Sequence, residues 1–430
     1  MEKQNESVWQ YREGVLFCEE SDLVRVAASH GTPAYVYSKL AIVQNFRAYE
    51  DALEGVPHRV CYAVKANSNL AVLNILSRQG AGFDIVSGGE LYRVLAAGGD
   101  PASVIFSGVG KTPAEIRFAL SKGIHSFNCE SEYELGQIAR AAISLSRTAS
   151  VAIRVNPDVN AITHPYISTG LRSHKFGIDM SAAAELYRRA AALPGLSVEG
   201  VSCHIGSQIL DTEPLLEAAD RVIKFVMELR SEGLTIRTLD LGGGLGVAYR
   251  DGERSPVVQE FLERLKPRLA GLELTLMLEP GRSIVAEAGI LLTRVLHIKQ
   301  NGGKRFVIVD AAMNDLLRPA LYQAYHEIVP VGQPDDLSGF PADVVGPVCE
   351  SGDFFAHSRQ LPELKPGDLL AIRTAGAYGF ALSGNYNSRP RVCELLVDGG
   401  EVHIIRKRET YEDLVRGESI PMAPALMPEI

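Results

Sequence analysis

The run Val60-Cys61-Tyr62-Ala63-Val64-Lys65-Ala66-Asn67 contains the first unit of the fold that the sequence predicts. Its apolar residues are typical of a short buried strand. Asn67-Ser68-Asn69 then interrupts the pattern before a helical pattern begins at about Leu70. Strand, short loop and helix in this order make one parallel β/α unit, so the question is how often the unit recurs.

Apolar strands and amphipathic helices alternate from about residue 58 to 290. The expected strands are Arg59–Val64, Gly82–Val86, Val104–Ser107, Ile124–Asn128, Val151–Asn156, Val198–His204, Thr238–Leu241 and Leu274–Leu278. The expected helices are Leu70–Arg78, Glu90–Ala97, Pro113–Ser121, Glu132–Ala141, Ala182–Ala192, Glu213–Leu229 and Val257–Leu269. Eight near-continuously apolar strands separated by helices favour a parallel sheet closed into a (β/α)8 barrel of the TIM type. A doubly wound open sheet is the alternative.

The pattern changes after about residue 290. The later segments alternate apolar and polar residues between Gly and Pro turns, which indicates a mostly antiparallel β-domain. Its expected strands are Leu291–Ile298, Arg305–Val309, Asp343–Cys349, Asp368–Arg373, Val392–Val397 and Val402–Arg406. The strand-like run Gly14–Glu19 precedes the barrel and could join this domain. We therefore expect a barrel over residues 34–289 and a β-domain built from residues 1–33 and 290–430.

The composition narrows the classes of partner. The chain has 430 residues and a formal net charge of -9, which argues against nucleic acid or an anionic membrane as a partner. No apolar run approaches the ~18 residues of a membrane span, and the polar N-terminus lacks the apolar core of a signal peptide. The six cysteines include no CxxC pair, so we expect neither a metal site nor disulfides. These features predict a cytoplasmic protein with reduced thiols.

Lys65 stands at the inner end of an apolar strand, where a lysine added for solubility is not expected. Burial lowers the pKa of a lysine amine, and the free amine is a nucleophile. Such amines commonly form Schiff bases with carbonyl groups, the aldehyde of pyridoxal phosphate (PLP) among them. Taken alone, a lysine that reaches from the strand end to solvent is the commoner case.

The other strand ends support the reactive alternative, because barrel enzymes carry their chemistry there. After Lys65, those ends and the turns that follow them carry, in chain order, Asp84, Asn156, His204, Gly242-Gly243-Gly244, Glu279 and Gly281-Arg282. The triple glycine allows backbone amides to approach an anion, and Gly281-Arg282-Ser283 opens a helix whose N-terminus favours a phosphate. Glu279 could keep a pyridine nitrogen protonated, and His204 could stack on the ring. A surface ion pair and a core histidine are the alternatives for these two residues.

Several segments together resemble one known family. Tyr62–Asn67, Phe83–Glu90, the His204 and Gly242 segments and Glu279–Arg282 resemble fold-type III PLP decarboxylases, which include the diaminopimelate, ornithine and arginine decarboxylases and, more distantly, alanine racemase. Asn156–Ala161, Thr163–Gly170, Lys175–Gly177 and Cys349–Asp353 are similar to the diaminopimelate decarboxylases in particular. The resemblance extends from about residue 13 to 415.

The resemblance implies roles for single residues. Lys65 resembles the Schiff-base lysine and His204 the histidine that stacks on the ring. Contacts to the cofactor are implied for Asp84, Ser207, Gly244, Glu279, Gly281, Arg282 and Tyr378. Arg282, Arg318, Tyr322 and Tyr378 match residues that bind the substrate. Cys349 resembles the proton donor and Glu350 a contact to the distal ammonium group.

The resemblance also implies a reaction and an assembly. The reaction would be PLP-dependent decarboxylation of meso-2,6-diaminopimelate to L-lysine, the last step of lysine biosynthesis. In this family Cys349 and Glu350 come from the neighbouring subunit, which implies a homodimer with shared active sites. A decarboxylase of ornithine, arginine or carboxynorspermidine is the nearest alternative, and a non-catalytic binding homologue is the alternative from another class. Glu279 disfavours a racemase. An arginine at this position would leave the pyridine ring neutral, and such a ring is a weaker electron sink that is better suited to racemisation.

Overall fold

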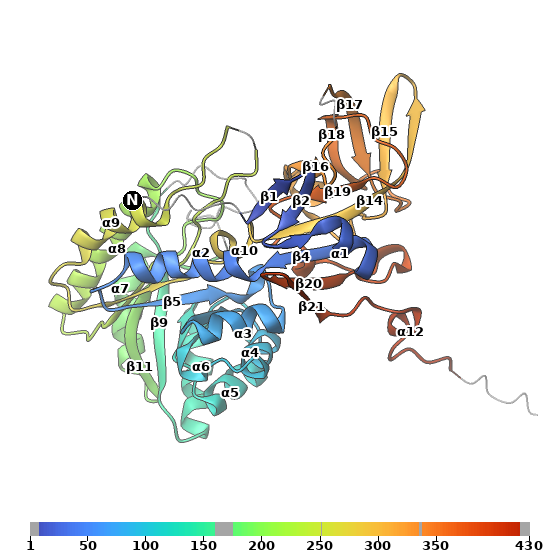
Figure 1. The fold of residues 1–430 in the computed structure, drawn as a ribbon. Helices are drawn as coiled ribbons and strands as arrows, with labels where there is room; N and C mark the ends of the chain where they lie inside the picture. The colour runs from blue at the N-terminus through green and yellow to red at the C-terminus, as the bar shows by residue number, and fades with distance from the viewer. Residues whose placement is uncertain (1–7, 160–174, 251, 335–337, 422–430) are drawn as a thin grey trace, which may run out of the picture.

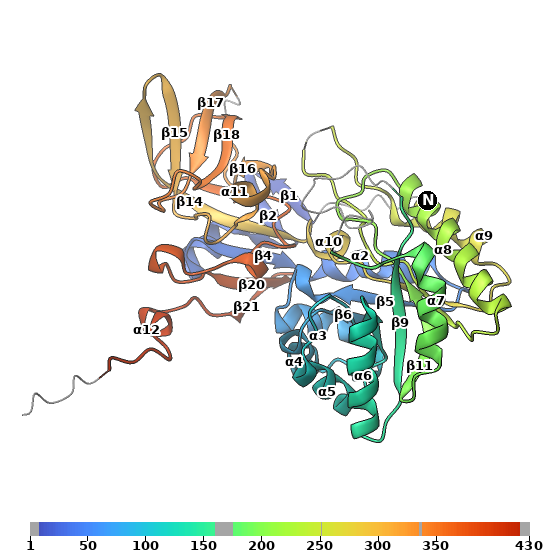
Figure 2. The same ribbon diagram turned by 180° about the vertical axis from the view of Figure 1, so that it is seen from behind.

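The computed structural model describes residues 8–159, 175–250, 252–334 and 338–421. The segment Thr163–Gly170, which supports the resemblance, therefore lies outside the described residues, as do Asn160 and Ala161. Two sheets of nine strands each form the main body (Figure 1). Figure 2 shows the same arrangement from behind, with the helices on the outside of the first sheet.

The first sheet contains a closed barrel of eight parallel strands. They are β5 (His58–Ala63), β6 (Gly82–Ile85), β7 (Val104–Phe106), β8 (Ser126–Cys129), β9 (Ala149–Asn156), β11 (Leu196–Ser202), β12 (Thr238–Asp240) and β13 (Thr275–Leu278). β13 pairs in parallel with β5, which closes the sheet, and the two-residue β10 (Ile178–Asp179) pairs with β9. The prediction of a (β/α)8 barrel is confirmed, and the open doubly wound sheet is wrong.

Helices follow the barrel strands, and their ends are set by local sequence. They are α3 (Leu70–Arg78), α4 (Gly88–Ala96), α5 (Pro113–Lys122), α6 (Glu132–Ser144), α7 (Met180–Ala191), α8 (Glu213–Ser231), α9 (Val258–Leu269) and the short α10 (Arg282–Val285). Asn69, the last residue of the predicted interruption, is the N-cap of α3, and its side chain accepts a hydrogen bond from Ala71 N. Gly123 ends α5 with φ 71°, a conformation that glycine adopts at little cost.

The second sheet forms the β-domain. Its path is β18 (Phe354–Leu361), β17 (Phe340–Val345), β15 (Lys304–Val309), β14 (Gly289–Asn301), β4 (Ala34–Ser38), β20 (Cys393–Asp398) and β21 (Glu401–Arg406). Off this path, β19 (Leu369–Ile372) pairs with β14, and β16 (Ile328–Pro330) pairs with β19. Most pairs are antiparallel, as predicted, but β4–β20 and β15–β17 are parallel. A small sheet of β1 (Trp9–Arg12), β2 (Val15–Cys18) and β3 (Ser21–Asp22) and the helices α1 (Leu23–His30), α11 (Arg318–Tyr322) and α12 (Tyr411–Leu414) complete it.

The boundary between the two domains near residue 34 stays a prediction, and strand pairing refines it. β4 lies between β14 and β20 in the second sheet, whereas α2 (Lys39–Ala52), which follows it at once, packs on the barrel helices α3, α9 and α10. We propose that the first boundary falls after Ser38. The later boundary, after residue 289, also stays a prediction; Gly289 is already the first residue of β14 in the second sheet.

The structure also bears on three features discussed for the sequence: membrane-spanning helices, metal sites and cysteines. Within the described ranges, no helix combines the length and apolar character that crossing a membrane requires. The same residues contain no group of three or more His, Cys, Asp or Glu side chains arranged to hold a metal ion. All six cysteines are described and are free thiols, five of them buried and Cys349 exposed.

Candidate active site

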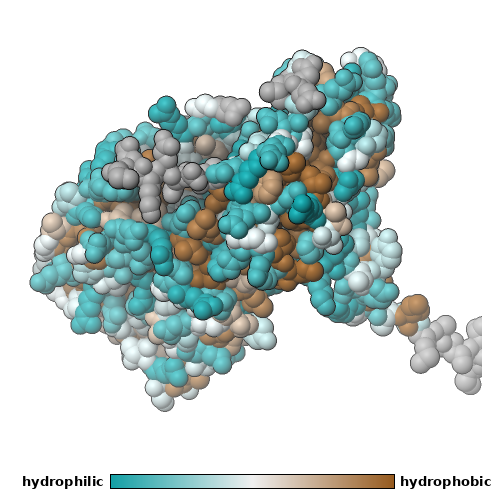
Figure 3. All heavy atoms as spheres, viewed as in Figure 1, coloured by the Kyte–Doolittle hydropathy of each residue, from teal (hydrophilic) through white to brown (hydrophobic). Residues whose placement is uncertain are grey.

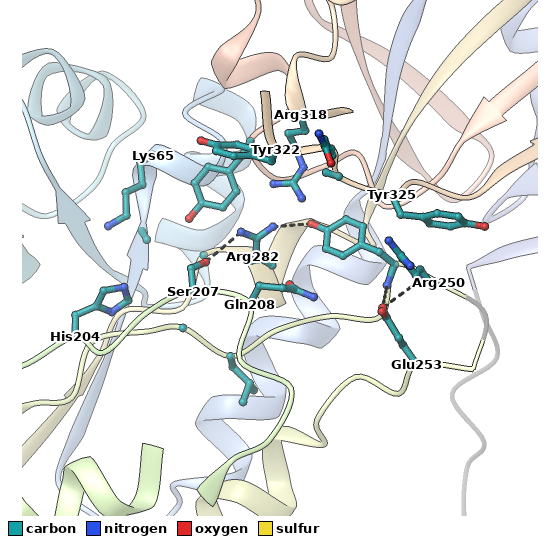
Figure 4. A pocket seen from close by; sticks show the side chains of 18 of the residues that line it. Lys65, His204, Ser207, Gln208, Arg250, Glu253, Arg282, Arg318, Tyr322 and Tyr325 are labelled. Atoms are coloured by element: carbon teal, nitrogen blue, oxygen red, sulfur yellow. Dashed lines mark hydrogen bonds between the residues drawn. The ribbon is translucent and has the colours of Figure 1, made fainter. Parts of the chain in front are cut away.

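A cavity of about 440 Å³ lies where the C-terminal ends of the barrel strands meet the β-domain. Its lining combines strand-end residues of the barrel with residues of α11 and of the loop after β19. Ten of the predicted site residues line it: Lys65, His204, Ser207, Gly244, Glu279, Gly281, Arg282 and Tyr378, with Arg318 and Tyr322 from α11. Figure 4 shows the labelled side chains of Lys65, Arg282 and Arg318 pointing into this one space.

Lys65 is held in the short 3-10 turn Val64–Ala66, directly after β5. Its Nζ lies 2.8 Å from Oδ2 of Asp84, a residue of β6 whose side chain is fully buried. Burial would by itself lower the pKa of Lys65, but the Asp84 and Glu279 charges raise it well above its usual range. The expectation of a lowered pKa is therefore wrong for the protein without cofactor, because the sequence argument counted burial and not the facing carboxylates.

Three buried acids, Asp84, Asp240 and Glu279, lie near Lys65. We call this part of the cavity the acidic end. Nδ2 of Asn128 donates to Asp240 Oδ2 at 2.9 Å and to Glu279 Oε1 at 3.1 Å. Burial raises the pKa of Asp240 to about 6. Burial and the Asp240 and Asp84 charges hold the pKa of Glu279 well above its usual range. Glu279 is thus suited to hold a proton at neutral pH.

His204, after β11, faces the cavity in its neutral form. Its Nδ1 accepts a hydrogen bond from Gly243 N at 3.3 Å, so Nε2 carries the proton. Burial and the Arg154 and Lys65 charges keep the pKa of His204 well below its usual range. A neutral imidazole can lie flat against an uncharged or cationic ring without charge repulsion.

The glycine turns fit tightly against neighbouring backbone. A Cβ on Gly243 would lie 2.2 Å from the carbonyl oxygen of Glu279, and one on Gly244 would lie 2.5 Å from that of Gly206. Gly244 also has φ 111°, which side chains disfavour. Only glycine can therefore bring this backbone to the cavity, beside Ser207 and the start of α10 at Arg282.

Arg282 is buried and connects the two sides of the cavity. Its guanidinium donates to Tyr249 Oη at 2.7 Å and to Ser207 Oγ at 3.1 Å. It also lies 5.0 Å from the ring of Tyr378. Tyr378 itself has φ 56°, an unusual conformation for a non-glycine residue, and its N–H donates to Ala66 O at 2.8 Å. This strained turn places Tyr378 next to the Lys65 turn.

Arg318 and Tyr322, four residues apart, lie at the two ends of α11. Arg318 is buried, with its guanidinium 5.0 Å from the ring of Tyr249. Tyr322 is half-buried and lines the same cavity. We call Arg282, Arg318 and Tyr249 the basic end of the cavity.

Cys349 and Glu350 are not brought to this cavity by their own chain. Both are exposed, and Cys349 N donates to Asn387 Oδ1 at 3.0 Å. The loop that carries them lies between β17 and β18 of the β-domain. Their roles stay a prediction.

Sequence reasoning missed several residues of the site. Ser107 and Asn128, which both hydrogen-bond to Glu279, stand at the ends of the third and fourth predicted strands and could have been found by reading every strand end. Asp240, the last residue of β12, stands two residues before the triple-glycine turn and gives a similar signal. Tyr249 and His326 lie in loops without a sequence signal of this kind.

The residues of the cavity suit PLP by their chemistry. An amine that can bond an aldehyde, an acid that holds a proton, and a glycine backbone beside a hydroxyl and a guanidinium match its aldehyde, ring nitrogen and phosphate. Asp84 Oδ1 and Arg282 Nε are buried polar atoms without a hydrogen-bond partner among the described residues. Each could therefore form a further hydrogen bond with a bound group.

Comparison with known proteins identifies the family. The family model "Pyridoxal-dependent decarboxylase, pyridoxal binding domain" matches residues 40–286. A diaminopimelate decarboxylase of Pseudomonas aeruginosa is 57% identical over 410 residues, which cover 95% of this chain and 98% of the relative. The structure of diaminopimelate decarboxylase from M. jannaschii has a TM-score of 0.92 at 39% identity and covers 96% of this chain and 98% of its own. That of the Helicobacter pylori enzyme, complexed with L-lysine, has a TM-score of 0.88 at 46% identity, with 92% and 98% covered. The chain therefore belongs to the diaminopimelate decarboxylases, a family of pyridoxal-dependent decarboxylases.

Proposed function

We propose that the protein catalyses the PLP-dependent decarboxylation of meso-2,6-diaminopimelate to L-lysine and CO2, the last step of lysine biosynthesis. The observation that carries the proposal is a single cavity with Lys65 and a proton-holding acid at one end and two buried arginines at the other. Ornithine and arginine lack a second carboxylate and would leave one arginine unpaired, which disfavours them as substrates.

The residues of the acidic end and the glycine turns would hold the cofactor. When bound, PLP supplies an electron sink for the pair of electrons left as CO2 departs. Lys65 would hold its aldehyde, and Gly244, Gly281, Ser207 and Arg282 its phosphate. Glu279 would keep the proton on the ring nitrogen. His204, held neutral by burial and nearby cations, would cover one face of the ring.

The residues of the basic end would orient the substrate. Arg282, Arg318 and Tyr322 offer guanidinium and phenol donors to carboxylates, and Tyr378 lies beside them. Asp84, which is fully buried, fixes the Lys65 amine by the 2.8 Å contact and so directs it towards the same space.

Cys349 and Glu350 would complete the site from a second copy of the chain. We propose a homodimer in which Cys349 protonates the product carbon and Glu350 binds the distal ammonium group. Their exposure on the β-domain supports this proposal, because neither reaches the cavity of its own chain. Figure 3 shows hydrophobic residues gathered where the barrel meets the β-domain, a surface that a partner could cover. The free thiols agree with a cytoplasmic location.

The first experiment offers meso-diaminopimelate, ornithine and arginine in parallel to purified protein with added PLP, and measures CO2 and the amine product. We expect turnover of meso-diaminopimelate alone. Turnover of ornithine or arginine instead would keep the cofactor assignment but overturn the substrate assignment.

Coexpression of two inactive variants tests the shared site. Homodimers of Lys65→Ala lack the lysine in both sites, and homodimers of Cys349→Ala lack the thiol in both sites. We expect the Cys349→Ala homodimer still to bind PLP. Random pairing of the two chains would restore about a quarter of wild-type turnover if each site draws on both chains. No recovery in a sample shown to contain the mixed dimer would place both residues in sites of a single chain.

A further inference from the structure

Arg318 is held in place by uncharged groups. Its Nε donates to Nε2 of His326 at 3.3 Å, and its guanidinium lies 5.0 Å from the ring of Tyr249. Over the described residues no carboxylate makes an ion pair with Arg318. This is unusual for a buried arginine, because buried charges are normally paired.

His326 can accept this hydrogen bond because its tautomer is fixed from the other side. Nδ1 of His326 lies 2.9 Å from the carbonyl oxygen of Arg373, the residue after β19. A carbonyl oxygen only accepts, so Nδ1 carries the proton and Nε2 presents its lone pair to Arg318. The side chain is completely buried. Burial and the charge of Arg318 lower the pKa of His326 to about 3, so the ring is neutral at the pH of the cell.

The neutrality of His326 decides what Arg318 can do. A carboxylate in the same place would hold the guanidinium more strongly, but it would also cancel its charge. A neutral acceptor on Nε fixes the plane of the guanidinium and leaves the two terminal nitrogens with their full charge. Those nitrogens form the edge that binds a carboxylate in a bidentate manner.

We propose that His326 is a positioning residue that presents Arg318, uncompensated, to a carboxylate of the substrate and so selects dicarboxylic substrates over monocarboxylic ones. The inference rests on the proposed function, because it takes Arg318 as a contact of a substrate carboxylate. His326 does not touch the substrate and acts through Arg318 alone.

Two inhibitors measure this selection apart from turnover. Pimelate is the seven-carbon dicarboxylate with the carbon chain of diaminopimelate, and heptanoate lacks its second carboxylate. The ratio of their inhibition constants against the PLP-loaded enzyme reports the carboxylate that Arg318 binds. A purely structural role of His326 would change both constants together and leave the ratio unchanged.

Two variants of nearly equal size test whether the group that contacts Arg318 must be uncharged. His326→Gln can keep a neutral acceptor near Arg318, whereas His326→Glu puts a carboxylate there. We expect the ratio to stay within about threefold of wild type for the first and to fall about 10- to 100-fold for the second, the range of a lost hydrogen bond between charged groups. KM for meso-diaminopimelate should rise in parallel, with a smaller change in kcat. The matched control is His125→Gln, which changes a half-buried histidine before β8, at the opposite end of the barrel, and should leave the ratio unchanged.

Further outcomes decide between the two proposals. An unchanged ratio in His326→Glu would overturn the inference while leaving the proposed function intact. A wild-type enzyme that does not prefer pimelate would overturn the assignment of Arg318 to a substrate carboxylate and with it the inference, whereas the proposed function fails only if meso-diaminopimelate is not decarboxylated. If His326→Glu does not load PLP, His326→Asn, whose shorter side chain cannot replace Nε2, takes its place with the same expectation. Loss of PLP by all three variants would make His326 a residue of the fold alone and refute the inference.

Discussion

The two ends of the cavity hold their charges in opposite ways. At the acidic end, burial raises the pKa of Asp240, and burial together with the Asp240 and Asp84 charges raises that of Glu279 further, so that Glu279 retains a proton. At the basic end, Arg282 and Arg318 are held by a hydroxyl, a phenol and an imidazole, and their charges stay uncompensated. The comparison teaches that one end of the site is built to keep a proton and the other to meet a negative ligand.

The strongest test of the acidic end is Lys65→Ala. We expect turnover to fall on the order of 10³-fold or more, because the group that would bond the cofactor is removed. The visible absorbance of covalently bound PLP should disappear with it. Lys122→Ala, at the exposed end of α5, is the control. Survival of the absorbance in the Lys65 variant would assign the bond to another amine.

The matching test of the basic end is Arg318→Lys, which keeps the charge and removes the planar pair of donors. We expect KM for meso-diaminopimelate to rise about 10- to 100-fold, with a smaller fall in kcat, since lysine cannot bind a carboxylate in a bidentate manner. PLP binding, followed by absorbance, should not change. A reduced PLP affinity with unchanged KM would move Arg318 to the cofactor.

The raised pKa values of the acidic end predict a pH effect on stability. A carboxyl whose pKa is higher in the folded than in the unfolded protein stabilises the fold at low pH, and this stabilisation is lost as the pH rises through the folded value. For Asp240 that window runs from about pH 4 to its folded pKa of about 6. Asp240→Asn should therefore make the PLP-free protein less sensitive to pH, by about 1–2 kcal/mol of unfolding free energy across this window.

Denaturant titrations of wild type and Asp240→Asn at pH 4.5 and pH 8 measure the difference. Identical pH dependence in the two proteins would show that Asp240 titrates as it does in the unfolded chain. No equivalent effect is expected for variants of the basic end, whose arginines stay charged over this range.

The smallest expected effect is that of Tyr249→Phe at the basic end. The variant keeps the ring near Arg282 and Arg318 and loses only the hydrogen bond from Arg282. We expect kcat/KM to fall about 2- to 10-fold, since one neutral partner contributes about 0.5–1.5 kcal/mol. A loss as large as that of Arg318→Lys would mean that the phenol contacts the ligand itself.

The barrel could be predicted from the sequence because its signals are local. The helix Leu70–Arg78 begins and ends at the predicted residues, and every predicted barrel strand overlaps an observed one. β4 lies in the β-domain, and its place there depends on pairing with β14 and β20, far along the chain. The sequence gives no local sign of such a pairing.

The same limit applies inside the site. The strand-end rule and the family resemblance named the residues that line the cavity, but not how they are held. The direction of the Lys65 pKa shift depends on Asp84 and Glu279, which meet it only in the closed barrel. Likewise, the contact of Arg318 with His326 and the tautomer set by Arg373 require α11, β16 and β19 to be packed together.

The turn that carries Lys65 is hydrogen-bonded to both domains. Ala63 N donates to Pro280 O of the barrel, while Tyr378 N and Asn67 Nδ2 join Ala66 O and Gly376 O across the domain boundary. The position of Lys65 therefore depends on how the two domains pack together. Partial unfolding of the β-domain would disturb the Lys65 turn while the barrel is still intact. Release of PLP on heating should then precede the loss of barrel helicity, and a barrel produced alone should load the cofactor poorly.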